Sequence, residues 1–206
     1  MSFNEANAVE RLICVALSGA RSTVSSATGL ARVGGSLSGA GWRNVPASSL
    51  PREEHEPWVE SYLIDALKRL NPEINAKTDL ADEVLYKLRA IVQSVRTDGL
   101  IKANEEFTAW LRGERSMPFG QNHEHVSIRL VDFNDIENNQ YVLTTQFSYR
   151  AGAVTQRPDV VLLVNGLPLV IIEAKTPVRS AVSWVDGALQ VQRYEHDAPE
   201  LFVANV

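Results

Sequence analysis

Two polar segments bracket a pair of apolar runs in the last third of the chain, and their residue types could perform metal-ion chemistry. Asp159 precedes the run at 160–164, and Glu173 and Lys175 stand two positions apart after the run at 169–172. Carboxylate oxygens are the ligands that Mg²⁺ prefers, and an ammonium group beside the ion can orient the attacking water. Burying these charges at strand ends is costly unless they pair or bind metal. The pattern therefore predicts Mg²⁺-dependent phosphodiester hydrolysis.

The turn between the two runs decides whether the carboxylates can meet. A strict two-residue turn at Asn165-Gly166 would direct Asp159 and Glu173 to opposite faces of the sheet, because side chains alternate along a strand. One additional residue would set them opposite each other, and Pro168, which cannot donate to the ladder, is placed to cause it. We therefore predict a three-residue or bulged turn at 165–167.

A further polar pair follows downstream. Gln190 and Tyr194 are four residues apart in an expected helix at 183–196, so both lie on one helical face. Such a pair is common on any helix, but an amide beside a phenol can orient a phosphate, a water molecule or Lys175. We therefore include both residues in the candidate site.

Hydrophobic periodicity indicates which elements position these residues. A helical period is expected in four segments before the site, namely 4–17, 53–70, 79–95 and 104–111. Strands are expected at 126–131, 141–147, 160–164 and 169–172. The sequence therefore predicts an α/β fold with a mostly antiparallel sheet. Residues 18–41, rich in Ser, Gly and Ala and without acids, are expected to form a flexible insertion; their near match to a phosphate-binding loop lacks the lysine.

Composition excludes several classes of protein. The chain has 206 residues, of which 45% are hydrophobic and 22% are charged. These values are typical of a globular protein. The apolar stretch at 160–172 is too short to span a membrane, and the first residues lack the basic region of a secretory signal. The single cysteine, Cys14, is expected to be buried in a reducing compartment, so we predict a cytoplasmic protein.

The charge distribution qualifies a nucleic-acid role. The net charge of −5 argues against strong electrostatic binding of nucleic acid. Residues 150–193, however, carry five bases and three acids, and their net charge is therefore +2. Any polyanion chemistry should be located in that segment.

Several of these motifs together resemble the N-terminal endonuclease region of the R (HsdR) subunit of type I restriction enzymes. The similarity rests on the segments Val131–Asn139 and Gln156–Pro177, on Gln190 and Tyr194 followed by Pro199–Phe202, and on Leu67–Pro72. It covers nearly the whole chain except residues 18–41.

The resemblance implies a PD-(D/E)xK, RecB-like nuclease fold, with a mixed central sheet flanked by helices and an inserted helical segment. It implies Asp159, Glu173 and the Ala174 carbonyl as metal ligands. Lys175 would act on water, with Gln190 and Tyr194 as accessory residues. The family also has an acid on the first helix, and the candidates, in decreasing order of match, are Glu10, Glu5 and Glu60.

The same resemblance implies the cofactor, the partners and the organisation of the chain. Mg²⁺ would be the cofactor, double-stranded DNA the substrate, and M and S subunits the partners, with ATP needed only by motor domains that this chain lacks. We expect a truncated subunit, an isolated domain or a gene fragment. Its parts would be a first helix (1–17), an insertion and linker (18–52), a helical segment (53–113) and a nuclease core (114–206).

Two alternatives remain open at this point, a non-catalytic docking or remnant domain of a restriction complex and a stand-alone RecB-like repair nuclease. Two other groups are expected to be structural. His123 and His125 lack a third metal ligand and should lie at a solvated loop edge. The four tryptophans are expected to be core or cap residues and not base-stacking platforms: Trp42, Trp58, Trp110 and Trp184.

Overall fold

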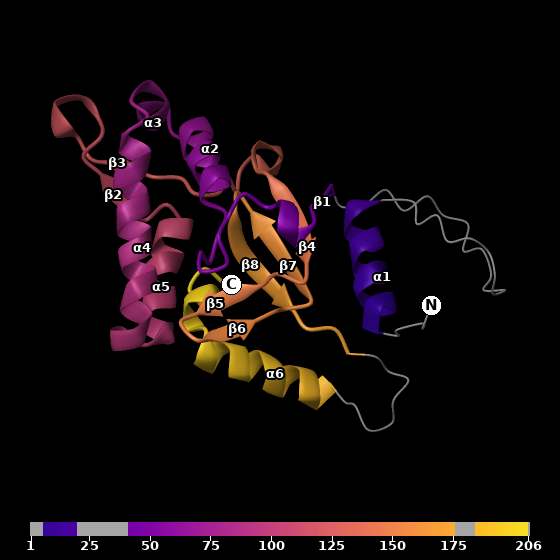
Figure 1. Cartoon of the computed structure of the whole chain (residues 1–206). Coiled ribbons are helices and arrows are strands. Elements are labelled where there is room, and N and C mark those ends of the chain that lie inside the picture. Colours follow the sequence, from indigo (N-terminus) through magenta and orange to yellow (C-terminus); the bar gives the residue numbers. More distant parts are fainter. Residues whose placement is uncertain (1–5, 20–40, 176–183, 206) are drawn as a thin grey trace.

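A four-stranded sheet forms the centre of the protein (Figure 1). The computed structural model describes residues 6–19, 41–175 and 184–205. The strand order is β1-β4-β7-β8, with bounds Arg43–Asn44, Tyr141–Thr145, Val160–Val164 and Leu167–Ile172. β1 is parallel to β4, and the other neighbours are antiparallel. A mixed sheet in an α/β protein is therefore confirmed.

The alternation of side chains along the strands gives the sheet two buried faces. Leu143 and Leu162 pack with Cys14 of helix α1 (Ala6–Ser18) on one face. Val161 and Leu163, which point the other way, pack with residues that follow α6 (Trp184–Asp197), in the 3₁₀ helix η4 (Pro199–Phe202). All five residues of β7 are buried for this reason.

The remaining helices form a second layer with its own core. These are α2 (Glu60–Leu70), α3 (Pro72–Ala76), α4 (Leu80–Asp98) and α5 (Leu100–Leu111). α4 and α5 pack side by side, away from α1 (Figure 1). Val164 and Leu167, at the turn of the β7–β8 hairpin, belong to the same hydrophobic cluster as residues of α2 and α4. The helical segment is thus packed against the sheet.

Several boundaries differ from the sequence-based expectation. The helix expected from residue 53 begins at Glu60. Pro57 interrupts the expected span, because a proline disfavours helical geometry at the residue before it. The strand expected at 126–131 is only Val126–Ser127 (β3), paired with Ser116–Met117 (β2). Beyond it, the Arg129 backbone N–H and C=O bond to the side chain of Asn71 and not to a strand.

Several small elements were not foreseen, among them one strand and one hairpin. Strand β1 lies within the segment that the sequence suggested was insertion and linker, although residues 20–40 of that segment lie outside the described ranges. A hairpin of β5 (Tyr149–Ala151) and β6 (Val154–Gln156) also forms, with little apolar alternation to signal it. Within the described ranges, no helix has the length and hydropathy needed to cross a lipid bilayer.

The β7–β8 hairpin contains the predicted extra residue, but not in the turn. Asn165 and Gly166 form a strict two-residue connection, and their φ angles are both positive, at 52° and 85°. Positive φ at both central residues is what a type I′ turn requires. The register shifts within the strands, between Leu162 and Leu163, because Leu163 pairs with Pro168 whereas Leu162 pairs with Val170. The predicted bulge is therefore confirmed, and its predicted position at 165–167 is wrong.

Candidate active site

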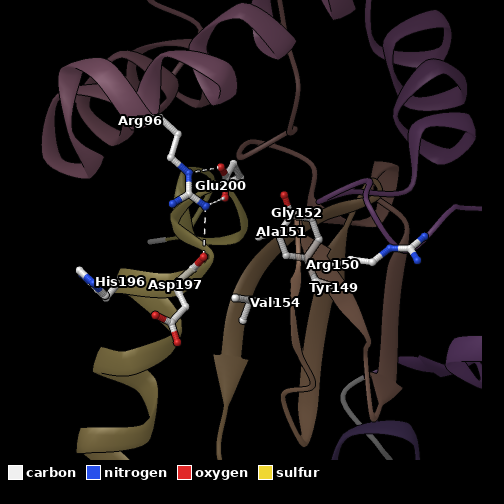
Figure 2. A pocket seen from close by; sticks show the side chains of 9 residues that line it. All are labelled: Arg96, Tyr149, Arg150, Ala151, Gly152, Val154, His196, Asp197 and Glu200. Carbon is white, nitrogen blue, oxygen red and sulfur yellow. Dashed lines mark hydrogen bonds and ion pairs between the residues drawn. The ribbon is translucent and has the colours of Figure 1, made fainter.

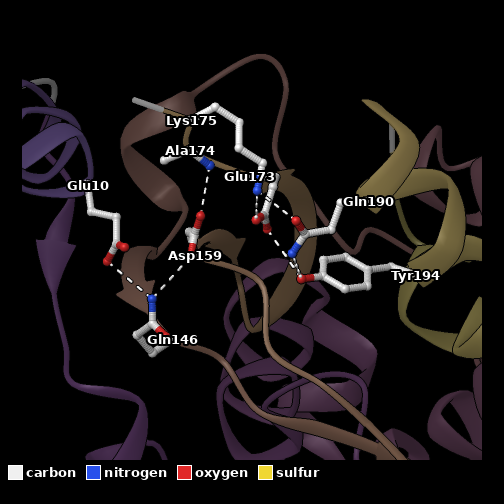
Figure 3. Close-up of polar contacts among 8 residues, drawn as sticks. All are labelled: Glu10, Gln146, Asp159, Glu173, Ala174, Lys175, Gln190 and Tyr194. Carbon is white, nitrogen blue, oxygen red and sulfur yellow. Dashed lines mark hydrogen bonds and ion pairs between the residues drawn. The ribbon is translucent and has the colours of Figure 1, made fainter. Parts of the chain in front are cut away.

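The candidate residues gather where β7 begins and β8 ends (Figure 3). Val160 pairs with Ile172 in the last pair of the ladder, so Asp159 and Glu173 are the next residues on the two strands. α6 supplies Gln190 and Tyr194 from one side, and α1 supplies Glu10 from the other (Figure 3).

Four side chains close a hydrogen-bonded ring. The Lys175 ammonium donates to Glu173 Oε1 at 2.7 Å and to Gln190 Oε1 at 2.6 Å. Gln190 Nε2 donates to the Tyr194 hydroxyl at 2.5 Å, and that hydroxyl donates to Glu173 Oε2 at 3.3 Å. We call these residues the four-residue ring. It fixes the amino group of Lys175 between a strand and a helix.

Asp159 is held by a second set of contacts. Its Oδ2 accepts a hydrogen bond from the Ala174 backbone N–H at 2.9 Å. Its Oδ1 accepts from Gln146 Nε2 at 3.2 Å, and the same nitrogen donates to Glu10 Oε2 at 3.2 Å. The structure therefore brings Glu10 to Asp159 through Gln146.

Gln146 is the site residue that the sequence analysis missed. It directly follows β4, and its backbone N–H donates to the Asp159 carbonyl at 2.9 Å. The only signal was a polar side chain at the end of a strand that pairs with the strand after Asp159.

Burial and like charge raise the pKa of the Glu10 and Glu173 carboxyls. Burial raises the pKa of the Glu10 carboxyl, and the negative charge of Asp159 adds to this, while Gln146 and Arg157 act in the opposite direction. Burial is also the main reason that the pKa of the Glu173 carboxyl is raised, with Asp159 again contributing and Lys175 opposing. Asp159 is therefore close enough to both glutamates to repel them, and a cation among the three carboxylates would relieve that repulsion.

The donor set has the chemistry that Mg²⁺ requires, since its members are carboxylate oxygens. As the side chains lie, however, no group of three or more His, Cys, Asp or Glu residues in the described ranges could hold a metal ion. The oxygens of Asp159 and Glu173 accept hydrogen bonds from neighbouring groups in this arrangement. Ala174 contacts Asp159 through its N–H, and the role of its carbonyl stays a prediction.

The structure places two of the three candidates for the first-helix acid. Glu10 is 9% exposed and lies beside Asp159. Glu60 belongs to α2 and pairs with Arg89, so the expectation that it could reach the site is wrong. Glu5 lies outside the described residues.

The cysteine, the two histidines and three of the four tryptophans lie as the sequence predicted, and one tryptophan does not. Cys14 is buried, and His123 and His125 are exposed, as expected. Trp58 and Trp110 are core residues, and Trp42 packs edge-on against Tyr141. The same expectation is wrong for Trp184, which is 82% exposed at the start of α6 because that end of the helix projects beyond the sheet (Figure 1).

A separate pocket lies away from this site (Figure 2). Its volume is about 550 Å³, and it lies between the β5–β6 hairpin and the C-terminal end of α6. The ion pair of Arg96 with Glu200 closes one side of it, with a nitrogen–oxygen distance of 2.6 Å. None of the candidate catalytic residues lines this pocket.

Comparisons with known proteins show the family of the chain. The family model described as Type I restriction enzyme R protein N terminus matches residues 33–205. The Type I restriction enzyme HindI endonuclease subunit of Haemophilus influenzae is 33% identical over 146 residues, which make up 69% of this chain and 13% of that protein. The putative type I restriction enzyme MjaVIIP endonuclease subunit of Methanocaldococcus jannaschii is 34% identical over 79 residues, 38% of this chain and 7% of that protein.

No solved structure matches the chain. The chain spans less than a fifth of the length of these two relatives. The family model, by contrast, covers most of the chain, including β7, β8 and α6. The protein therefore belongs to the family of type I restriction enzyme R protein N termini.

Proposed function

We propose that this chain is the DNA endonuclease domain of a type I restriction enzyme R subunit and has a PD-(D/E)xK nuclease fold. The observation that carries the proposal is the four-residue ring, which holds Lys175 beside Glu173 next to Asp159. A structural role alone does not explain why a lysine, two carboxylates and a helical Gln/Tyr pair converge at one end of a hairpin.

In this proposal Asp159, Glu173, Glu10 and the Ala174 carbonyl hold Mg²⁺. The ion supplies charge neutralisation at the scissile phosphate. Two hydrogen bonds hold the Lys175 ammonium at the carboxylate edge, and its third N–H is left to donate to a water molecule. Tyr194 keeps the Gln190 amide oriented, so that its oxygen faces Lys175.

The wider assembly follows from the family and is part of the same proposal. Double-stranded DNA would be the substrate, and M and S subunits would provide modification and sequence recognition. ATP would be needed only by motor domains elsewhere in the R subunit. The relatives named above are endonuclease subunits, and that term in their names supports the reaction. We place the activity in the cytoplasm as part of the same proposal.

The alternative of a non-catalytic docking domain is favoured by one observation. The carboxylate oxygens of Asp159 and Glu173 accept hydrogen bonds from neighbouring groups of the protein. Within the described residues, no three such side chains are placed so that they could hold a metal ion. A docking domain would have no reason to bind a divalent cation at Asp159.

Plasmid nicking tests the proposal. The chain should convert supercoiled plasmid to the open-circular form in Mg²⁺, and Lys175→Ala should reduce the rate at least about 100-fold, since one oriented electrostatic donor contributes about that much. Lys87→Ala, an exposed lysine on α4, is the matched control and should cut at the wild-type rate. Calorimetric titration with Mn²⁺ should show binding that Asp159→Asn abolishes. Equal nicking by Lys175→Ala, or no Mn²⁺ binding by the wild type, would refute the proposal.

A further inference from the structure

The side chain of Gln146 bridges two carboxylates that come from distant segments. Its Nε2 lies 3.2 Å from Glu10 Oε2 on α1 and 3.2 Å from Asp159 Oδ1 before β7 (Figure 3). A primary amide nitrogen carries two N–H groups, so it can donate to both carboxylates at once. This nitrogen lies between the two acids, where a bound cation would otherwise offset their charge.

The backbone fixes Gln146 in this place. Its N–H donates to the Asp159 carbonyl at 2.9 Å, and the Phe147 N–H donates to the Pro158 carbonyl at 3.2 Å. The φ of Gln146 is 56°. This left-handed conformation costs free energy for any residue with a Cβ. The next side chain, Phe147, is fully buried below the Arg52 guanidinium. The β4 strand therefore ends in a strained turn that aims the amide at the carboxylates.

We infer that Gln146 belongs to the metal site: its amide holds Glu10 and Asp159 together without an ion and turns its carbonyl oxygen toward an ion when one binds. The part of this inference that concerns the ion rests on the proposed function. A cation between the two carboxylates would repel the N–H₂ group, which carries partial positive charge. The opposite end of the same amide is a carbonyl oxygen, a ligand type that hard divalent cations accept.

Two substitutions distinguish this role of Gln146 from a role in maintaining the fold alone. A glutamate at this position would repel Glu10 and Asp159 in the metal-free protein but would add a carboxylate to the metal site. A leucine would remove both the donor and the acceptor. The two substitutions should therefore shift stability in the same direction and metal affinity in opposite directions.

Calorimetric titration of the 206-residue chain with Mn²⁺ tests the metal-bound arrangement. Gln146→Glu should bind Mn²⁺ at least about 5-fold more tightly than the wild type, and Gln146→Leu about 10-fold more weakly, as expected for a change of one ligand in the coordination sphere. Both variants should unfold at lower urea concentration than the wild type in EDTA. Affinities that change in the same direction, or do not change, would overturn the ion-facing role.

A double-mutant cycle in EDTA tests the bridge without any metal. The variants are Glu10→Gln, Gln146→Leu and their combination, each compared with the wild type by urea unfolding. The change in the unfolding equilibrium constant on replacing Gln146 should be at least about 5-fold smaller when Glu10 is already neutral, because the effects of contacting residues are not additive. Additive effects would overturn the bridge. If the wild type binds no Mn²⁺, the proposed function and the ion-facing role both fail, and this cycle still decides whether Gln146 holds the two carboxylates.

Discussion

Val160 lies opposite Ile172 at the open end of the β7–β8 hairpin. If every residue were paired from the two-residue turn onward, Val160 would instead lie opposite Ile171. The difference is Leu169, which has no partner in the ladder because Leu163 pairs with Pro168 and Leu162 with Val170. This one extra residue brings Asp159 and Glu173 into equivalent positions on neighbouring strands. The proposed metal ligands therefore depend on a bulge located several residues away from them.

Insertion of one alanine between Ile172 and Glu173 should remove the candidate site while leaving the residues of the site in the chain. The alanine would then lie opposite Asp159, and Glu173 and Lys175 would be directed to the face opposite Asp159, since a one-residue slip reverses every side chain. We expect Mn²⁺ binding to be lost and nicking to fall at least about 100-fold, as for loss of a whole catalytic unit. Deletion of Leu169 removes the unpaired residue, keeps Leu162 opposite Val170 and should retain Mn²⁺ binding. An insertion variant that binds Mn²⁺ as well as this control would contradict the role of the register.

Gly187 should be needed for Lys175 and not for the stability of α6. A Cβ at this buried helical position would lie 3.3 Å from Lys175 Cγ, so Gly187→Ala must displace the lysine side chain by a few tenths of an ångström. Alanine also favours the helix by about 1 kcal/mol relative to glycine. We expect nicking to slow by about 10-fold, because small misplacements of a catalytic group are costly. Urea unfolding should show unchanged or higher stability.

The control for Gly187→Ala is Gln192→Ala, an exposed change on the same helix. It should leave both nicking and stability close to the wild-type values. A Gly187→Ala variant that nicks DNA at the wild-type rate would show that Lys175 does not need the space above this glycine.

Arg52 should contribute more to stability than other surface arginines. Its guanidinium donates to the carbonyls of Glu54, Glu56 and Ser148 and stacks 3.9 Å from the centre of the Phe147 ring. Arg52→Ala should lower the free energy of unfolding by about 2–4 kcal/mol, because several charge-assisted hydrogen bonds are lost together. The measurement is urea unfolding monitored by tryptophan fluorescence.

Two further variants distinguish the geometry of Arg52 from its charge. Arg52→Lys should recover less than half of the loss, because an ammonium group cannot reach several carbonyls in one plane. Arg112→Ala, at an exposed position after α5, should change stability by no more than about 0.5 kcal/mol. Full recovery by lysine would mean that charge alone accounts for the effect.

Tyr149 should make the protein less stable at alkaline pH. Burial, with a further contribution from Glu200, raises the pKa of its hydroxyl to about 12. Below about pH 10 both the folded and unfolded states keep this proton, so the group adds no pH dependence. Between about pH 10 and 12 the unfolded state loses the proton first, and stability therefore falls as pH rises, by up to about 2–3 kcal/mol.

Urea unfolding at about pH 9 and about pH 11, on either side of the ordinary tyrosine pKa, measures the contribution of Tyr149. The wild type should lose more stability between these two values than Tyr149→Phe, which has no hydroxyl to ionise. Equal losses in the two proteins would show that the buried hydroxyl does not control the alkaline transition.

The sequence by itself determined the parts of the site that depend on local periodicity. Glu173 and Lys175 share a face because strands repeat every two residues, and Gln190 meets Tyr194 because helices bring residues four apart together. The helices at 79–95 and 104–111 and the central strands were also recognisable, because their apolar residues recur at a regular spacing.

Only the tertiary structure decided which distant residues meet at the site. Glu10 and Glu60 have the same chemistry, and the packing of Cys14 and its neighbours against β4 and β7 is what brings Glu10 to the site. Gln146 likewise became part of the site only through pairing with the strand that starts at Val160. The hydrophobic periodicity of a helix or strand specifies which of its faces is buried. Contacts between distant segments depend on how several such faces fit together, and no single stretch of sequence contains that information.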